Sequence, residues 1–255
     1  MCALPISALV AARNHARAKA RLSRKKVDRW VIVASAESHS SIKSAADVMD
    51  VEIVLAEPGD DLVLRKSHVE HAMNEYLEAH PTHEVFAIVA TAGATNLGII
   101  DDLQSLGEIA NRNNIWFHVD GAYGLAGLCA PSLRPLFNGI EKCDSFIVDP
   151  HKWLFAPFDA CALVYRNPDI AKKAHYQKAS YLETLEDEHE WNPSDYAIHL
   201  TRRPRGLPFW YSLASNGTKA YADAVEDTMD TTRIAVRLIK EHPNLDLLKI
   251  GRAHV

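Results

Sequence analysis

The stretch Ile115-Trp116-Phe117-His118-Val119-Asp120-Gly121-Ala122-Tyr123 decides the fold, together with Ser145-Phe146-Ile147-Val148-Asp149-Pro150-His151-Lys152-Trp153. Each stretch opens with a short apolar run, which is typical of a strand buried on both faces of a parallel sheet. In an open α/β sheet, ligands bind beyond the carboxyl ends of the strands. The sequence therefore predicts that the Asp120 carboxylate and the Lys152 amine reach one crevice.

Strand and helix signals alternate along the rest of the chain. Further apolar runs predict strands at residues 30–34, 51–56, 85–90 and 160–165. Helical patterns cover residues 8–22, a segment capped by Ser40 or Ser41 that runs to residue 49, residues 64–79, and a segment that starts at Asp101 or Asp102 and runs to residue 113. After Gly206 the pattern is helical again, with an expected interruption at Pro208 and a last helix to about residue 240. This alternation predicts an α/β fold, a mostly parallel sheet with helices on both faces.

Composition narrows the class of protein. The chain has 255 residues, of which 47% are hydrophobic and 24% charged, as in ordinary globular proteins. A net charge of −5 gives no reason to expect nucleic acid binding, and we interpret the basic run Arg24-Lys25-Lys26 as a solvated helix end. The 4 cysteines lack zinc-ligand spacing and favour a reducing, cytoplasmic setting. No apolar stretch approaches the roughly 20 residues that span a bilayer, and no signal peptide is recognisable.

An amine and a carboxylate in one crevice suit pyridoxal phosphate. This cofactor forms a Schiff base with a lysine and needs an acidic partner that keeps its pyridine nitrogen protonated. Taken alone, an aspartate after a strand is often a helix cap and a lysine there is often solvated. The combination is more specific, because a histidine directly precedes Lys152 and small residues follow Asp120.

These segments resemble the group II pyridoxal-phosphate-dependent amino acid decarboxylases, the family of aromatic amino acid, glutamate, histidine and diaminobutyrate decarboxylases. Further matching segments, in the order found in the family, are Ser38-His39-Ser40-Ser41-Ile42-Lys43, Ala90-Thr91-Ala92-Gly93-Ala94-Thr95-Asn96-Leu97-Gly98 and Ala179-Ser180-Tyr181-Leu182. The resemblance implies the large domain of a fold-type-I, aminotransferase-like enzyme. It also implies an amino acid substrate and a homodimer.

The resemblance assigns roles to individual residues around the cofactor. Lys152 would form the Schiff base and Asp120 would face the ring nitrogen. His39 would stack on the ring, and Ala122 would pack on its other side. His151 would contact the phosphate.

Two further roles depend on the resemblance. Thr95 would support the stacking histidine, although Ala94 stands where the family often has another threonine. Tyr181 would deliver a proton to carbon after CO2 leaves, and a phenylalanine there would indicate aldehyde synthesis instead. Arg202, Arg203 and Arg205 match an arginine-rich stretch, but Thr201 replaces a frequent glycine, which leaves the choice of substrate open.

The two ends of the chain predict truncation. Cys2-Ala3-Leu4-Pro5-Ile6 and Ile250-Gly251-Arg252-Ala253-His254-Val255 are compatible with one DNA sequence read in opposite orientations, which resembles a sequencing adapter. Coincidence through codon choice is the alternative. We therefore expect adapter translation at residues 1–6 and 250–255, a cofactor-binding large domain at 7–205 without its N-terminal part, and helices at 206–248 that lead into a truncated C-terminal domain. The family's phosphate loop, which precedes the first helix, would be missing.

The sequence thus favours decarboxylation of an L-amino acid to an amine and CO2 by an incomplete chain. Two alternatives stay open. One is other chemistry with the same cofactor, such as aldehyde synthesis or lyase activity, and the other is an inactive remnant that serves association. No metal site is expected.

Overall fold

A computed structural model of the chain describes residues 4–176, 192–198 and 201–247. Its centre is one sheet of six strands in the order β2-β1-β3-β4-β5-β6. The strands are β1 (Arg29–Ser35), β2 (Glu52–Ala56), β3 (His83–Thr91), β4 (Trp116–Asp120), β5 (Ser145–Val148) and β6 (Ala162–Tyr165). The first five run parallel and β6 pairs antiparallel with β5. The predicted mostly parallel α/β sheet is confirmed.

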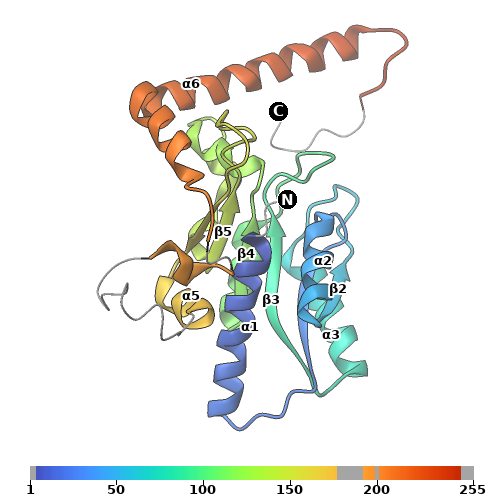
Figure 1. Ribbon diagram of the computed structural model, residues 1–255. Helices are drawn as coiled ribbons and strands as arrows, with labels where there is room; N and C mark the ends of the chain where they lie inside the picture. Colours follow the sequence, from blue (N-terminus) through green and yellow to red (C-terminus); the bar gives the residue numbers. More distant parts are fainter. Residues whose placement is uncertain (1–3, 177–191, 199–200, 248–255) are drawn as a thin grey trace.

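Helices cover both faces of this sheet (Figure 1). They are α1 (Leu4–Leu22), α2 (Ser40–Met49), α3 (Lys66–Ala79), α4 (Leu103–Arg112), α5 (Pro168–His175) and α6 (Gly206–Glu241), with short 3-10 helices η1 (Gly124–Cys129), η2 (Arg134–Phe137), η3 (Ile140–Lys142) and η4 (Pro193–Tyr196). None of these described helices combines the length and apolarity needed to cross a membrane.

The side chains of β1 show how the two core layers divide. Val31 and Val33 belong to the layer formed with α3, α4 and α6, whereas Ile32 and Ala34 belong to the layer formed with α1 and α2. Successive residues of a strand point to opposite faces, so a strand buried on both faces is mostly apolar along its whole length. This explains why the central strands read as uninterrupted apolar runs.

The long helix α6 corrects one sequence expectation. Pro208 does not interrupt it, since it lies in the first turn, where the missing N–H would have no intrahelical acceptor. The break falls instead at Gly217, which has φ 78° and ψ 163°. Figure 1 shows α6 lying across the end of the molecule at which the parallel strands terminate.

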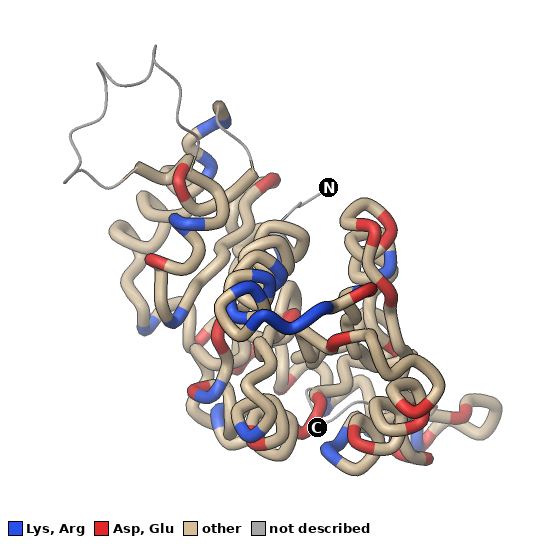
Figure 2. The backbone as a smooth tube through the Cα atoms, turned by 90° about the horizontal axis from the view of Figure 1, so that it is seen from below, with Lys and Arg blue, Asp and Glu red and all other residues tan. Residues whose placement is uncertain are grey.

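Charges of both signs are scattered over the chain, and the Lys and Arg positions of α1 and of the following connection gather at one end of the molecule (Figure 2). In that connection Lys25 pairs with Glu84 and Lys26 lies 3.7 Å from Asp28, with the two lysine side chains 54% and 90% exposed. The run Arg24-Lys25-Lys26 is therefore a solvated helix end, as predicted.

Candidate functional site

The carboxyl ends of three neighbouring strands lie in register. Thr91 of β3 is the partner of Asp120 in β4, and Asp120 is in turn the partner of Ile147 in β5. The loops that follow these strands therefore start side by side, at the edge of the sheet where ligands bind in open α/β folds.

Asp120 closes a strand whose five residues are all buried. Its side chain is only 6% exposed, and one carboxylate oxygen accepts a hydrogen bond of 3.1 Å from the Ala122 N–H. Burial raises the pKa of Asp120, while the Ala122 N–H, His39 and Lys152 oppose that rise and Asp149 adds to it. Asp120 is thus a buried acid within electrostatic reach of His39 and Lys152.

Lys152 lies in the turn that follows β5. Its amine is 3.0 Å from Asp149 Oδ2, and its backbone N–H donates to the Asp149 carbonyl at 2.9 Å. The Asp149 N–H donates to the Ala122 carbonyl, also at 2.9 Å. These contacts fasten the lysine turn to the segment that follows Asp120, so the predicted meeting of the Asp120 and Lys152 segments is present.

His39 is the N-cap of α2, a role that the sequence assigned to Ser40 or Ser41. Its Nδ1 accepts a hydrogen bond of 3.1 Å from the Ser41 N–H and lies 2.8 Å from the Ser41 hydroxyl. A ring nitrogen can replace the usual side-chain oxygen because the cap position requires only an acceptor for a free backbone N–H. The cap fixes the imidazole at the end of β1, beside the carboxyl end of β3.

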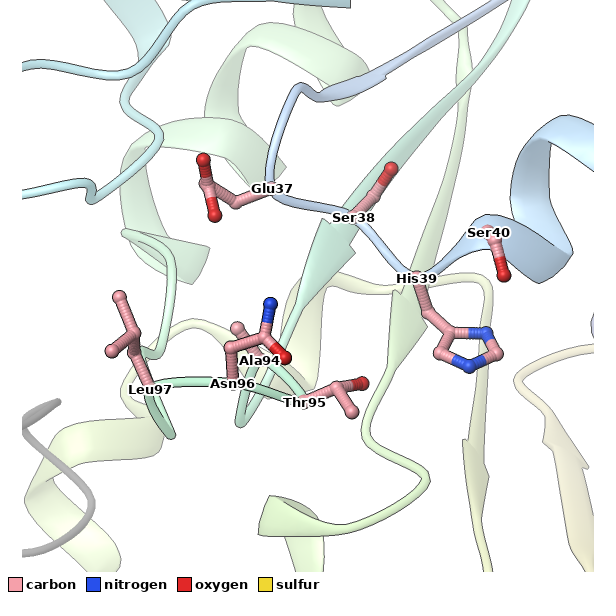
Figure 3. Close-up of a pocket in the computed structure, with 8 residues that line it drawn as sticks. All are labelled: Glu37, Ser38, His39, Ser40, Ala94, Thr95, Asn96 and Leu97. Atoms are coloured by element: carbon pink, nitrogen blue, oxygen red, sulfur yellow. The ribbon is translucent and has the colours of Figure 1, made fainter.

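Thr95 lies in the loop between β3 and α4, and this loop faces the His39 loop across a pocket of about 220 Å³. The pocket is lined by Glu37, Ser38, His39, Ser40, Ala94, Thr95, Asn96 and Leu97 (Figure 3). The structure therefore brings His39 and Thr95 to opposite walls of one hollow.

A close approach of two glycines holds the Thr95 loop in place. Gly93 has φ 100°, and a Cβ added there would lie 2.7 Å from the Gly124 Cα. A Cβ on Gly124 would lie 2.3 Å from the Ala92 carbonyl oxygen. The Ala92 N–H also donates to the Asp120 carbonyl at 2.8 Å. Only glycines allow this contact between the loop and the segment after Asp120.

Asp101 anchors the start of the Thr95 loop through its side chain. The sequence pattern did not predict this role, since it indicated Asp101 only as a possible helix cap. The cap is Asp102, whose carboxylate accepts from the Ser105 N–H. The Asp101 carboxylate is buried and accepts hydrogen bonds from the Thr91 and Leu64 N–H groups at 2.7 and 3.0 Å. Burial raises the pKa of Asp101 to about 7, against the effect of both backbone donors. Nothing in the local sequence distinguishes Asp101, whose side chain is buried, from Asp102, which caps the helix.

The remaining predicted residues are placed less centrally. Ala122 packs against the small cluster around Ile147. His151 Nδ1 lies 2.5 Å from the Ala160 carbonyl oxygen and 3.2 Å from the Ala160 nitrogen, and its ring lies edge-on to Phe158 at 5.0 Å. Its contact with a phosphate stays a prediction. Tyr181 lies outside the described residues.

The arginine stretch contacts its own surroundings. Arg202 donates to the Pro193 carbonyl at 2.6 Å, and Arg205 pairs with Asp159 at 2.8 Å. Both contacts are made within the chain, and they do not indicate which substrate these arginines would bind.

The central residues fit pyridoxal phosphate chemically. Lys152 supplies an amine that is 40% exposed, and Asp120 supplies a buried carboxylate that gains from a cationic partner such as a protonated ring nitrogen. Within the described part of the chain, the buried Asp149 Oδ1 atom has no hydrogen-bond partner, which is uncommon for a buried polar atom.

Comparison with known proteins agrees with this geometry. Residues 5–253 match the family described as the pyridoxal-dependent decarboxylase conserved domain. The chain belongs to this family. The family is described by its dependence on pyridoxal, so the cofactor is pyridoxal 5'-phosphate, as the sequence predicted.

Individual relatives differ in what they are named for. An acidic amino acid decarboxylase of Homo sapiens is 31% identical over 86% of this chain and 43% of its own length. A phenylacetaldehyde synthase of Arabidopsis thaliana is 27% identical over 94% of this chain and 50% of its own length. The chain thus spans about half the length of these relatives.

The fold is shared with a crystal structure of Oryza sativa TDC with PLP and tryptamine. The TM-score is 0.90 at 22% sequence identity, and the match covers 99% of this chain and 53% of the other. This likeness confirms the fold-type-I architecture of the described elements.

Proposed function

We propose that the full-length protein containing this chain decarboxylates an L-amino acid to the corresponding amine and CO2. The main support is that Asp120 and Lys152 lie at the ends of adjacent strands, on segments joined by backbone hydrogen bonds. His39 is also close enough to act electrostatically on Asp120. Membership of the decarboxylase family supports the reaction type.

Each residue has a separate task in this proposal. Lys152 binds the cofactor through its amine, and Asp120 holds a proton on the ring nitrogen. Bound pyridoxal phosphate supplies a protonated ring that accepts the electrons left when a carboxylate departs. His39 covers the ring, and Thr95 supports it from the facing loop. Tyr181, by resemblance, returns a proton to the carbon that lost CO2.

Aldehyde synthesis is the second candidate, since one relative is named a phenylacetaldehyde synthase. Tyr181 favours the decarboxylase, because the resemblance associates aldehyde synthesis with phenylalanine at this position. The amino acid substrate is left at class level, since relatives are named for acidic and for aromatic compounds.

We further infer a cytoplasmic homodimer. The apolar side chains of Leu207, Trp210 and Tyr211 at the start of α6 are 48%, 58% and 59% exposed, which supports burial against another chain. The 4 cysteines lack zinc-ligand spacing, and this supports a reducing compartment.

The test replaces Lys152 by alanine in the full-length protein. We expect loss of the visible cofactor absorbance after dialysis and loss of CO2 release from a panel of amino acids. Lys172→Ala is a matched control, because Lys172 also pairs with a buried aspartate, Asp195, at 3.4 Å, but lies in α5. Absorbance retained in Lys152→Ala, and trapped by borohydride on another lysine, would refute the assignment. Aldehyde in place of amine from the unaltered protein would favour the second candidate.

A further inference from the structure

Asp149 is a buried acid whose side chain has a single described partner. It is 4% exposed, more deeply buried than most carboxylates in folded proteins. Oδ2 lies 3.0 Å from the Lys152 amine, while Oδ1 is buried and has no hydrogen bond to any described residue. A carboxylate removed from water in this way depends strongly on its one cationic partner.

The backbone holds both partners in one rigid turn. Asp149 is bonded through its N–H to Ala122 and through its carbonyl to the Lys152 N–H, both at 2.9 Å. Pro150 follows and restricts the conformation of the aspartate before it, and its carbonyl accepts from the Ala156 N–H at 2.9 Å. The carboxylate therefore has a fixed position from which to hold the flexible lysine side chain.

The pair stands directly beside the buried acid at the end of β4. Lys152 and Asp149 both act electrostatically on Asp120, in opposite senses. Two carboxyl groups thus lie in the field of one lysine, but among the residues that the structure describes only Asp149 contacts its amine. Asp120 is consequently left available for a different cationic partner.

We propose that Asp149 is a positioning residue that holds the Lys152 amine at the carboxyl end of the sheet and leaves Asp120 for the cofactor ring. The relevance to catalysis rests on the proposed function of Lys152. The ion pair between Asp149 and Lys152 does not depend on that function, so it can be tested in the chain without cofactor or substrate.

The experiment measures how fast each lysine of the chain is acetylated by trace acetic anhydride at neutral pH, with peptides quantified by mass spectrometry. An amine held by a carboxylate reacts slowly, so Lys152 is expected to react more slowly than the exposed Lys43. Asp149→Asn keeps the shape of the side chain and removes its charge. It is expected to raise the Lys152 rate about threefold to tenfold and to leave the Lys172 rate unchanged.

Asp195→Asn is the matched control, since Asp195 is also buried and its carboxylate lies 3.4 Å from Lys172. It should raise the Lys172 rate and leave Lys152 unchanged. A Lys152 rate that is the same with and without the Asp149 charge would overturn the proposal, as would an equal rise in the Asp195 variant.

Circular dichroism checks that each variant is folded. If Asp149→Asn does not fold, the unaltered chain decides the matter: a Lys152 rate equal to that of Lys43 contradicts the pair, and a slower rate supports it. If Lys152 is labelled slowly but the full-length protein releases no CO2, the proposed function is wrong. The proposal that Asp149 holds the Lys152 amine is then still supported.

Discussion

Replacement of Asp101 by asparagine tests how the Thr95 loop is anchored. The carboxylate accepts from two backbone N–H groups, those of Thr91 and Leu64. An asparagine side chain offers one oxygen and turns an NH2 group toward the second donor. One buried N–H would lose its partner, which costs about 1–3 kcal/mol of unfolding free energy.

The pH dependence distinguishes this cost from ordinary damage. Burial raises the pKa of Asp101 from 3.8 to about 7, so the folded state binds a proton more tightly than the unfolded state. The stability contribution of this proton is complete below pH 3.8 and is lost as pH rises to about 7. At about 1.4 kcal/mol per pKa unit, the unaltered chain should lose about 2–3 kcal/mol between pH 5 and pH 8 through this group. The Asp101→Asn variant lacks this loss.

The assay is urea unfolding of both proteins at pH 5, 6, 7 and 8, followed by circular dichroism. The penalty of the variant should be largest at pH 5 and should shrink, or change sign, by pH 8. His118, whose burial lowers its pKa to about 4, is present in both proteins and cancels in the difference. A penalty that is constant over this range would show that Asp101 is ionised throughout, and the reasoning from burial would be wrong.

Three further substitutions test the site. Asp120→Asn should leave the fold intact and lower turnover of the full-length protein by orders of magnitude, since the ring nitrogen loses its counter-charge; unchanged turnover would reduce Asp120 to a capping residue. Gly124→Ala places a methyl group 2.3 Å from the Ala92 carbonyl oxygen and should lower the unfolding free energy by about 1–3 kcal/mol in thermal melts. Gly206→Ala, which meets nothing within 4 Å, is its control and should not destabilise. Tyr181→Phe should keep cofactor absorbance but replace amine by aldehyde in product analysis, and a normal amine yield would remove Tyr181 from the mechanism.

The strands could be predicted from the sequence because burial on both faces leaves a continuous apolar run. The expected strand at 85–90 lies within β3 (His83–Thr91), and the run at 145–148 is β5 itself. Helix ends were less predictable, since they depend on single residues. Pro208 looked like a break but fits the first turn, and Gly217, not singled out by the pattern, takes the positive φ at which α6 bends.

The site was predictable where it follows from topology. Asp120 and Lys152 could be placed together because parallel neighbouring strands end at one edge. Asp101 and Asp149 could not, because nothing in the local sequence shows that their carboxylates turn inward. Their burial results from the packing of segments distant in the chain, such as Leu64 against Asp101.

The order of the strands has a consequence for the growing chain on the ribosome. β3, β4 and β5 are successive in sequence and adjacent in the sheet, so the loops of Thr95, Asp120 and Lys152 come from one continuous run of synthesis. His39, which follows β1 and caps α2, is already made by then, and β1 pairs with β3 once β3 has been synthesised. Translation therefore supplies His39, Thr95, Asp120 and Lys152 before α6, and the hydrogen bond from Trp153 to Thr228 of α6 can form only after these residues have been made.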